Sequence, residues 1–139
     1  MKMKWVPNKS LGSFSLGENI APLIKRFGLI LDTKADEDGT SWDRYKLPGK
    51  ECYIDVDAKS GELMALSTYE SCEFNGTNVI GLTVQELEEL LNVEADEVDE
   101  PIEFDDGELH IARTYSELGL QAWFTSGKAY LASISDYTD

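Results

Sequence analysis

The chain has 139 residues, 42% of them hydrophobic, and its 27 acidic and 12 basic residues give a formal net charge of −15. A chain of this length can bury one core, so residues 1–139 are predicted to form a single domain. The negative charge disfavours nucleic acids and anionic membranes as partners. No apolar run has the length of a signal peptide or a membrane span, so we expect a cytoplasmic protein.

The first element predicted along the chain is a short helix after Asn19, a residue type that caps helix N-termini. Pro22 falls in the first turn, where proline is tolerated, and Gly28 can end the helix in a left-handed conformation. The apolar stripe of this helix is predicted to be Ile20, Leu23, Ile24 and Phe27.

Strand-like runs follow this helix. Residues 42–47 are predicted as one strand, and 52–56 and 63–68 as a hairpin with a three-residue turn at 59–61. The dipeptide Asn75-Gly76 predicts a turn between the two halves of the chain. The first half is therefore expected to be a helix followed by antiparallel strands.

The second helix has the clearest start signal in the sequence. Thr83 and Glu86 have the spacing of a capping box, in which each side chain bonds to the other residue's backbone N–H. Leu82 can pack against Leu87 across this start, and Asn92 can end the helix. Its buried face is predicted to consist of Leu87, Leu90 and Leu91.

The second half repeats the order of the first. A strand is predicted over residues 110–116, followed by a hairpin of 118–124 and 129–134 with a three-residue turn at 125–127. The predicted fold class is α+β, with two α-then-β-meander units that share one antiparallel sheet and place both helices on one face. The two units would span about residues 1–72 and 73–139.

The residues needed for catalysis do not occur together in this pattern. A serine or cysteine nucleophile needs a base, and the single histidine, His110, falls inside a predicted strand, where a structural role is the simpler interpretation. Asp55 begins a stretch that resembles a calcium loop, but the positions that require Gly and Glu hold Ser60 and Leu66. We therefore expect no enzyme activity, no catalytic residue, no cofactor and no metal site.

The two cysteines are Cys52 and Cys72, which lie on strands predicted to be neighbours. A disulfide between them is sterically feasible. Two cysteines in a cytoplasmic chain are more often reduced packing residues, and this is the favoured interpretation.

The negative charge is concentrated in one window. Nine of the 27 acidic residues fall between Glu94 and Glu108, where no Lys or Arg occurs. Such a window can steer a cationic partner, although acidic runs are also common as solvated loops that keep a protein soluble. Because no set of catalytic residues is recognised, partner binding is the favoured hypothesis. The candidate contact residues of the window are Glu94, Asp96, Glu97, Asp99, Glu100, Glu103, Asp105 and Asp106.

A second candidate contact region combines acids with aromatic residues, since Trp and Tyr are common anchors of protein interfaces. Trp42 follows a polar stretch and is predicted at an interface. Trp123 lies in an apolar strand and is predicted to pack in the core. The candidate contact residues of this region are Asp36, Glu37, Asp38, Trp42 and Tyr45.

Several short motifs resemble those of one class of bacterial protein. They are WVPNKSLG at 5–12 with FSLG at 14–17, FNG at 74–76 leading into GLT at 81–83, and YSELGL at 115–120. The chain resembles the immunity proteins of polymorphic-toxin and contact-dependent growth-inhibition systems, small cytosolic proteins built from tandem helix-plus-sheet units. The unit is also similar to the repeat of the secreted beta-lactamase inhibitor proteins. The resemblance implies a toxin-binding protein without catalytic residues, and it assigns no individual contact.

Two functions of different classes follow. In the first, the chain is an immunity protein that binds a cognate toxin, a basic nuclease, and occludes its active site or nucleic-acid surface with carboxylates and aromatic anchors. In the second, it is a small-molecule-binding or hydrolytic domain with a cleft between the sheet and a long loop. An adjacent toxin gene would favour the first function, and a metabolite bound to the purified protein would favour the second.

Overall fold

The computed structural model describes residues 2–35 and 41–136. Within these ranges the fold is α+β and dominated by antiparallel strands, as the sequence predicts. Two helices, α1 (Ile20–Phe27) and α2 (Val84–Leu91), accompany one large sheet and two small ones. Neither helix has the length and apolar character needed to cross a membrane, and no other helix in the described ranges does.

The large sheet contains nine strands within the described part of the chain. They are β4 (Ile30–Thr33), β5 (Trp42–Lys46), β6 (Cys52–Asp57), β7 (Leu63–Thr68), β10 (Glu97–Val98), β11 (Ile102–Glu103), β12 (Leu109–Tyr115), β13 (Leu120–Thr125) and β14 (Lys128–Ser135). Their order across the sheet is β10-β12-β13-β14-β7-β6-β5-β4, and β11 also pairs with β12. The halves of the chain meet where β14 pairs antiparallel with β7.

The two small sheets are made of strands only two residues long. The first consists of β1 (Trp5–Val6), β2 (Ser10–Leu11) and β3 (Phe14–Ser15), and the second of β8 (Glu73–Phe74) and β9 (Thr77–Asn78). The N-terminal segment also ties the halves together. The backbone N–H of Asn8 donates to the Leu118 carbonyl at 3.2 Å, and that of Gly17 donates to the Leu63 carbonyl at 2.8 Å.

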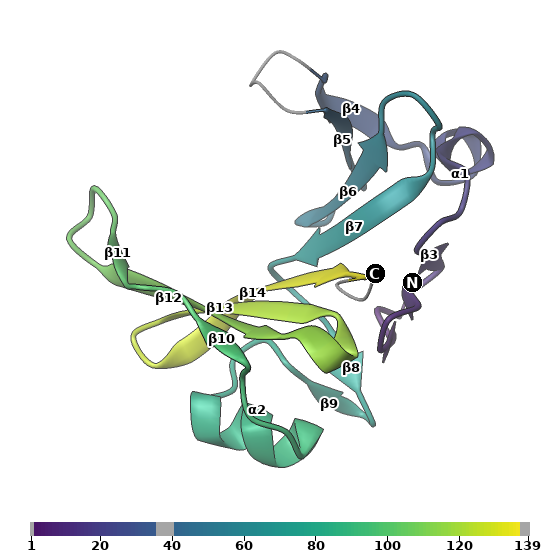
Figure 1. Ribbon diagram of the computed structural model, residues 1–139. Coiled ribbons are helices and arrows are strands. Elements are labelled where there is room, and N and C mark those ends of the chain that lie inside the picture. The colour runs from purple at the N-terminus through teal and green to yellow at the C-terminus, as the bar shows by residue number, and fades with distance from the viewer. Residues whose placement is uncertain (1, 36–40, 137–139) are drawn as a thin grey trace.

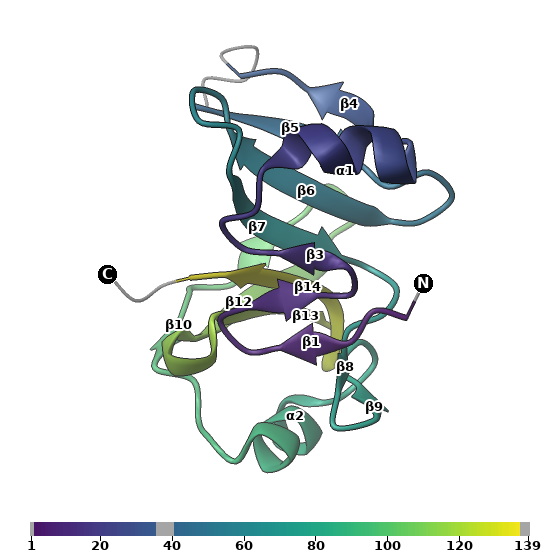
Figure 2. The same cartoon turned by 90° about the vertical axis from the view of Figure 1, so that its right-hand side faces the viewer.

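Both helices and the N-terminal sheet lie on the same side of the large sheet. Figure 2 shows α1 in front of β5 and β6, the β1–β3 sheet in front of β13 and β14, and α2 below them. In Figure 1, turned by 90°, α1 lies to the right of the first-half strands and α2 lies below the second-half strands. No described helix covers the opposite side, which we call the helix-free face.

The two helices begin and end where the sequence predicts. The Oδ1 atom of Asn19 accepts a hydrogen bond from the Ala21 N–H at 2.9 Å, and α1 ends at Gly28 with a φ of 66°. The Thr83 and Glu86 capping box is present at α2, which ends at Asn92 with a φ of 58°. Residues at the helix ends themselves therefore determine where both helices begin and end.

The core lies between the helices and the large sheet, and it is continuous across both halves of the chain. Leu87 and Leu91 of α2 are buried in it, whereas Leu90 is half-buried at its edge, so the predicted buried face is narrower than expected. Cys52 and Cys72 are free and buried, as favoured from the sequence. Burial raises the pKa of both thiols to about 12.

The second hairpin differs from the prediction at both ends of β13. Its loop has two residues, not three, because Thr125 pairs with Lys128 and only Ser126 and Gly127 form the turn. Both loop residues have positive φ, 53° and 79°, as a type I′ turn requires. At the other end, β13 begins later than predicted because residues 116–118 form a 3₁₀ turn, η1 (Ser116–Leu118).

Gly119 explains this late start, because it ends η1 with a φ of 70°. A Cβ atom at this position would clash with the carbonyl oxygen of Ser135 and the side chain of Asn8. The chain therefore needs glycine here both for its backbone conformation and for its close packing.

Candidate functional site

Side chains of the large sheet alternate between the core and the helix-free face. In β6 and β7, Ile54 and Leu66 are fully buried in the core, while their neighbours Tyr53 and Ser67 are only partly buried. Ile54 pairs with Leu66 and Tyr53 with Ser67, so each pair shares one face. Because successive strand residues point to opposite faces, Tyr53 and Ser67 belong to the helix-free face.

Trp123 also lies on the helix-free face, and its predicted position in the core is wrong. It is half-buried between Ala122 and Phe124, which are both buried. Its indole N–H donates to the Oε1 atom of Gln121 at 3.2 Å. The apolar composition of the strand concealed this alternation, since a strand with two covered faces has a similar sequence.

The two aromatic residues predicted at an interface do not share a surface. Trp42 is 37% exposed and pairs with Asp57, whereas Tyr45 pairs with Ile54 and packs against the core. Their positions three residues apart on β5 place them on opposite faces. Burial raises the pKa of Tyr45, and the nearby carboxylate of Asp43 adds to this. The other candidates of this region, Asp36, Glu37 and Asp38, lie outside the described residues.

A row of aromatic rings joins the two halves of the chain. The Tyr53 and Tyr69 ring centroids are 6.2 Å apart, and those of Tyr69 and Tyr130 are 6.3 Å apart. The row continues from Tyr130 to His110 at 5.1 Å and from His110 to Phe104 at 3.6 Å. We call these five residues the aromatic row. Its members Tyr69 and Phe104 are 42% and 44% exposed, so the row offers apolar surface to a partner.

An ion pair lies beside Tyr53, the end of the aromatic row in the first half of the chain. Arg44 donates from Nε to Oδ1 of Asp55 at 2.8 Å and from Nη2 to Oδ2 at 3.1 Å. The guanidinium lies over the Tyr53 ring at 5.6 Å, and the bond to Asp55 raises the pKa of Arg44. Next to Asp55 is a hollow of about 290 Å³ that Trp42 also lines. A bidentate pair of this kind fixes the positions of both side chains.

The acidic window forms an arm at the far edge of the sheet. Residues 94–108, here called the acidic arm, contribute β10 and β11 and the turn into β12, and Figure 1 shows the β11 end projecting from the molecule. Asp99 is half-buried and the other eight acids are exposed. Among the residues that the structure describes, the ion pairs join Arg44 to Asp55, Lys46 to Glu51 and Arg113 to Glu88. None of these three ion pairs involves an acid of the arm.

Three acids of the arm have partners inside the chain. One is Glu108, whose Oε2 atom accepts from the Thr125 hydroxyl at 3.2 Å. Asp96 accepts hydrogen bonds from the Ser116 N–H at 2.7 Å and the Ser116 hydroxyl at 2.6 Å, and these bonds lower its pKa. Asp106 accepts from the backbone N–H of Glu108 at 2.9 Å. The remaining candidates have carboxylates without a hydrogen-bond partner in the described part of the chain, and they are Glu94, Glu97, Asp99, Glu100, Glu103 and Asp105.

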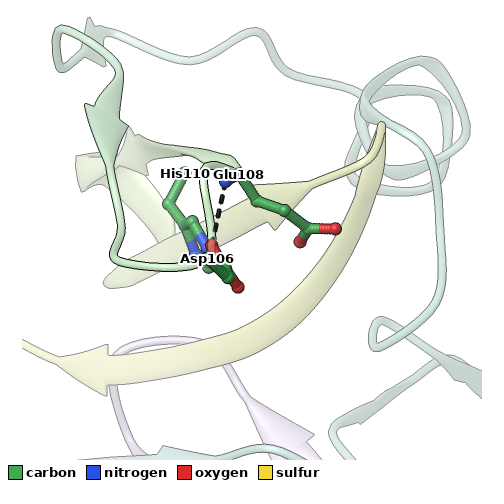
Figure 3. A group of neighbouring side chains, drawn as sticks. All are labelled: Asp106, Glu108 and His110. Atoms are coloured by element: carbon green, nitrogen blue, oxygen red, sulfur yellow. Dashed lines mark hydrogen bonds between the residues drawn. The ribbon is translucent and has the colours of Figure 1, made fainter.

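Three side chains at the tip of the arm could hold a cation. Asp106, Glu108 and His110 each offer one ligand atom, and these atoms lie within 4.8 Å of one another (Figure 3). No metal site was expected from the sequence, where the calcium-loop pattern beginning at Asp55 was considered and rejected. The available signal was the spacing Asp-x-Glu-x-His, in which Asp106 lies in the turn and Glu108 and His110 flank Leu109 at the start of β12.

A hollow with a volume of about 930 Å³ lies along α2. It is lined by α2 and the residues that follow it, so it is not the expected cleft between the sheet and a long loop. Its charged lining consists of Glu88, Glu89, Glu94 and Glu117. Glu88 is already engaged, since its Oε2 accepts from Arg113 at 3.2 Å and from the Tyr115 hydroxyl at 2.9 Å. The charged lining is entirely acidic, so the hollow would suit a cationic ligand.

Comparison with protein-family models, curated proteins and solved structures finds no significant match to this chain. The function is therefore argued from the geometry of the aromatic row and the acidic arm.

Proposed function

We propose that this protein is a cytoplasmic immunity protein that binds a cognate toxin, a basic nuclease, and occludes its active site or nucleic-acid surface. One observation carries the proposal: Phe104 belongs both to the acidic arm and to the aromatic row. Unpaired carboxylates and exposed aromatic rings thus form one continuous surface. Carboxylates accelerate encounter with a basic protein, and aromatic anchors supply affinity once they are buried.

The class of toxin follows from the charge of the arm. A nuclease binds phosphates through Lys and Arg, which contribute most of its affinity for nucleic acid. The six carboxylates without internal partners offer those cations an alternative to phosphate. A bound arm would exclude the substrate by charge and by volume, and no catalytic residue on the immunity protein is needed.

The arrangement of the elements supports a two-unit organisation. In chain order, α1 precedes β4 to β7 and α2 precedes β10 to β14, and the two sets of strands adjoin at β7 and β14. We infer two α-then-β-meander units, about residues 1–72 and 73–139, with both helices on one face. In this organisation the opposite face is left for the toxin.

A small-molecule-binding or hydrolytic domain is the second candidate, and the hollow of about 930 Å³ along α2 favours it. Its acidic lining would suit a cationic metabolite. Native mass spectrometry of the purified protein separates the two candidates, because a retained small molecule without any bound protein would support the second one.

The deciding experiment is co-expression of the tagged protein with the product of the adjacent upstream gene. We expect the two proteins to co-purify and the cells to be protected from growth arrest. Tyr69→Ala, which removes an exposed ring from the aromatic row, should weaken the complex. Val6→Ala is the matched control, because Val6 is 37% exposed on the N-terminal sheet, on the other side of the large sheet. Equal weakening by both variants, or no complex at all, would contradict the proposal.

A further inference from the structure

The turn that leads into β12 gathers three potential metal ligands. Asp106 and Glu108 are exposed and His110 is buried, and one ligand atom of each lies within 4.8 Å of the others. Figure 3 shows the three side chains at this turn, with the Glu108 N–H directed at the Asp106 carboxylate. Exposed carboxylates often cluster without binding an ion, so a metal site here depends on His110.

The imidazole of His110 has a buried nitrogen that no described group satisfies. The residue is only 7% exposed, and its Nε2 atom is buried without a hydrogen-bond partner among the described residues. Phe104 stacks on the ring with an interplanar angle of 7° and keeps water from that side. A buried polar atom without a partner is rare, because its desolvation is not compensated. Because two carboxylates also lie close to this histidine, the unpaired nitrogen points to a cation that accepts its lone pair.

The other ring nitrogen of His110 has the partner that a metal-binding histidine needs. Nδ1 lies 2.7 Å from the hydroxyl oxygen of Tyr130. When Nδ1 carries the proton and donates it to this oxygen, the lone pair is on Nε2. Metal-bound histidines commonly donate their second N–H to an oxygen in this way, which fixes the tautomer and the ring orientation.

Both carboxylates keep one oxygen atom available. Asp106 uses Oδ1 to accept from the Glu108 N–H at 2.9 Å, and Glu108 uses Oε2 to accept from the Thr125 hydroxyl at 3.2 Å. These bonds set the position of each carboxylate without occupying its second oxygen. Two carboxylates would also neutralise the charge of one divalent cation.

We propose that Asp106, Glu108 and His110 bind a divalent transition-metal ion, for which Zn²⁺ is the best match. Zn²⁺ takes imidazole nitrogen and carboxylate oxygen at about 2.0 to 2.2 Å, so tetrahedral ligand atoms lie about 3.4 Å apart. Rotation of the two exposed carboxylates can close the remaining distance. Mg²⁺ and Ca²⁺ prefer all-oxygen sites and should bind more weakly. The fourth position would be left for water or for a group of a partner.

The site does not rest on the toxin proposal, so it is tested with the full chain and the metal alone. Isothermal titration of metal-stripped protein with ZnCl₂ should show one equivalent bound with micromolar affinity. Asp106→Asn with Glu108→Gln keeps the hydrogen-bond acceptors but removes both charges, and should weaken binding at least about tenfold. Glu97→Gln with Glu100→Gln removes the same charge from the same arm and should leave the affinity unchanged.

Two further measurements keep the assignment testable without truncating the buried histidine. Tyr130→Phe removes the oxygen that orients Nδ1 and should weaken Zn²⁺ binding by about 10 to 100-fold. The Nε2 chemical shift of His110 should move when Zn²⁺ is added. The proposal is overturned if no heat is released, if several equivalents bind weakly, if the Glu97 and Glu100 variant loses as much affinity as the Asp106 and Glu108 variant, or if Mg²⁺ binds as tightly.

Discussion

Both carboxylate oxygens of Asp96 accept hydrogen bonds from Ser116, one from its backbone N–H and one from its hydroxyl. These bonds link the beginning of the acidic arm, which precedes β12 in the chain, to η1, which follows β12. The arm therefore starts from a fixed point, and Asp96 acts within the fold. The acids of the arm that have no internal partner, such as Glu97 and Glu100, can contact a partner without loss of internal bonds.

Asp96→Asn should make the protein less stable at neutral pH, whereas Glu97→Gln should not. The hydrogen bonds lower the pKa of Asp96 below its ordinary value of 3.8, so the folded state favours the ionised form. The resulting stability is present above that ordinary value and is lost as the pH falls through the lower folded value. Thermal denaturation between pH 2 and pH 7 measures this. If the stability of the Asp96→Asn variant falls as steeply at acid pH as that of the unmodified protein, the role assigned to Asp96 is contradicted.

Removing charge from the arm should slow association with the toxin and leave the fold intact. Glu97→Gln with Glu100→Gln removes two exposed carboxylates that have no internal partner, and should reduce the association rate severalfold at low salt. Salt screens such steering, so the difference from the unmodified protein should shrink at about 0.15 M salt. Surface plasmon resonance against a catalytically inactive toxin measures both rates.

The control for this pair is Glu62→Gln with Glu117→Gln, which changes the net charge by the same amount at exposed positions outside the arm. We expect a smaller effect on the association rate from the control. If the two pairs slow association equally, total charge rather than the arm attracts the partner. If neither pair changes it, the arm is a solvated loop and the aromatic row alone remains as the contact surface.

Phe124→Ala should destabilise the protein far more than Trp123→Ala, although the two residues are neighbours. Phe124 is 4% exposed in the core, and truncation of a buried phenylalanine costs about 3 to 5 kcal/mol. Trp123 is half-buried on the helix-free face, so its loss should cost less while weakening toxin binding more. Urea denaturation gives the two free energies of unfolding. A larger loss for Trp123→Ala would restore the core position expected from the sequence.

The parts of the fold that sequence analysis predicted are those set by short-range chemistry. The caps of α1 and α2 depend on residues within one helical turn, such as Thr83 and Glu86, and these were correct. The strands of hairpin β6–β7 were also correct, because their alternating apolar residues are a local signal, but residues 58–62 connect them instead of the predicted three-residue turn at 59–61. The strands β1 to β3 were missed, since two residues are too few to show a periodicity.

The candidate site depends on pairings between distant segments. Tyr53 and Tyr130 belong to one row only because Tyr69 lies between them where β7 pairs with β14. No local pattern specifies that pairing. In the same way, the burial of His110 follows from the stacking of Phe104, which comes from the arm folding back on β12. Sequence analysis named the arm, but it could not find the surface that the arm completes.

Leu87→Ala should cost about 2 to 5 kcal/mol, the usual range for truncating a buried leucine, and Leu90→Ala should cost clearly less. Leu87 is fully buried, whereas Leu90 packs against the edge of the core. Chemical denaturation of both variants, followed by circular dichroism, checks this. Equal losses would mean that α2 buries the broader face predicted from the sequence.

The free energy of unfolding should fall steeply at alkaline pH, because three buried groups hold their protons more tightly in the folded state. Burial raises the pKa of Cys52 and Cys72 from 9.0 to about 12, and burial together with the bond to Glu88 raises that of Tyr115 from 10.0 to about 12. Each group has a raised folded pKa, so its contribution is complete below the unfolded value and is lost as the pH rises toward 12.

The contributions of the two cysteines and of Tyr115 can be separated because their ordinary pKa values differ, 9.0 for the thiols and 10.0 for the phenol. Each thiol should contribute a slope of up to about 1.4 kcal/mol per pH unit above pH 9. Cys52→Ala with Cys72→Ala lowers the stability at every pH by loss of packing, but it should flatten the curve between pH 9 and pH 10, where Tyr115 does not yet contribute. Urea denaturation at half-unit steps from pH 8 to pH 11, with a reductant present, measures the slopes. Identical slopes in the two proteins would show that the thiols are already ionised or accessible in the folded state, and the buried positions of Cys52 and Cys72 would then be wrong.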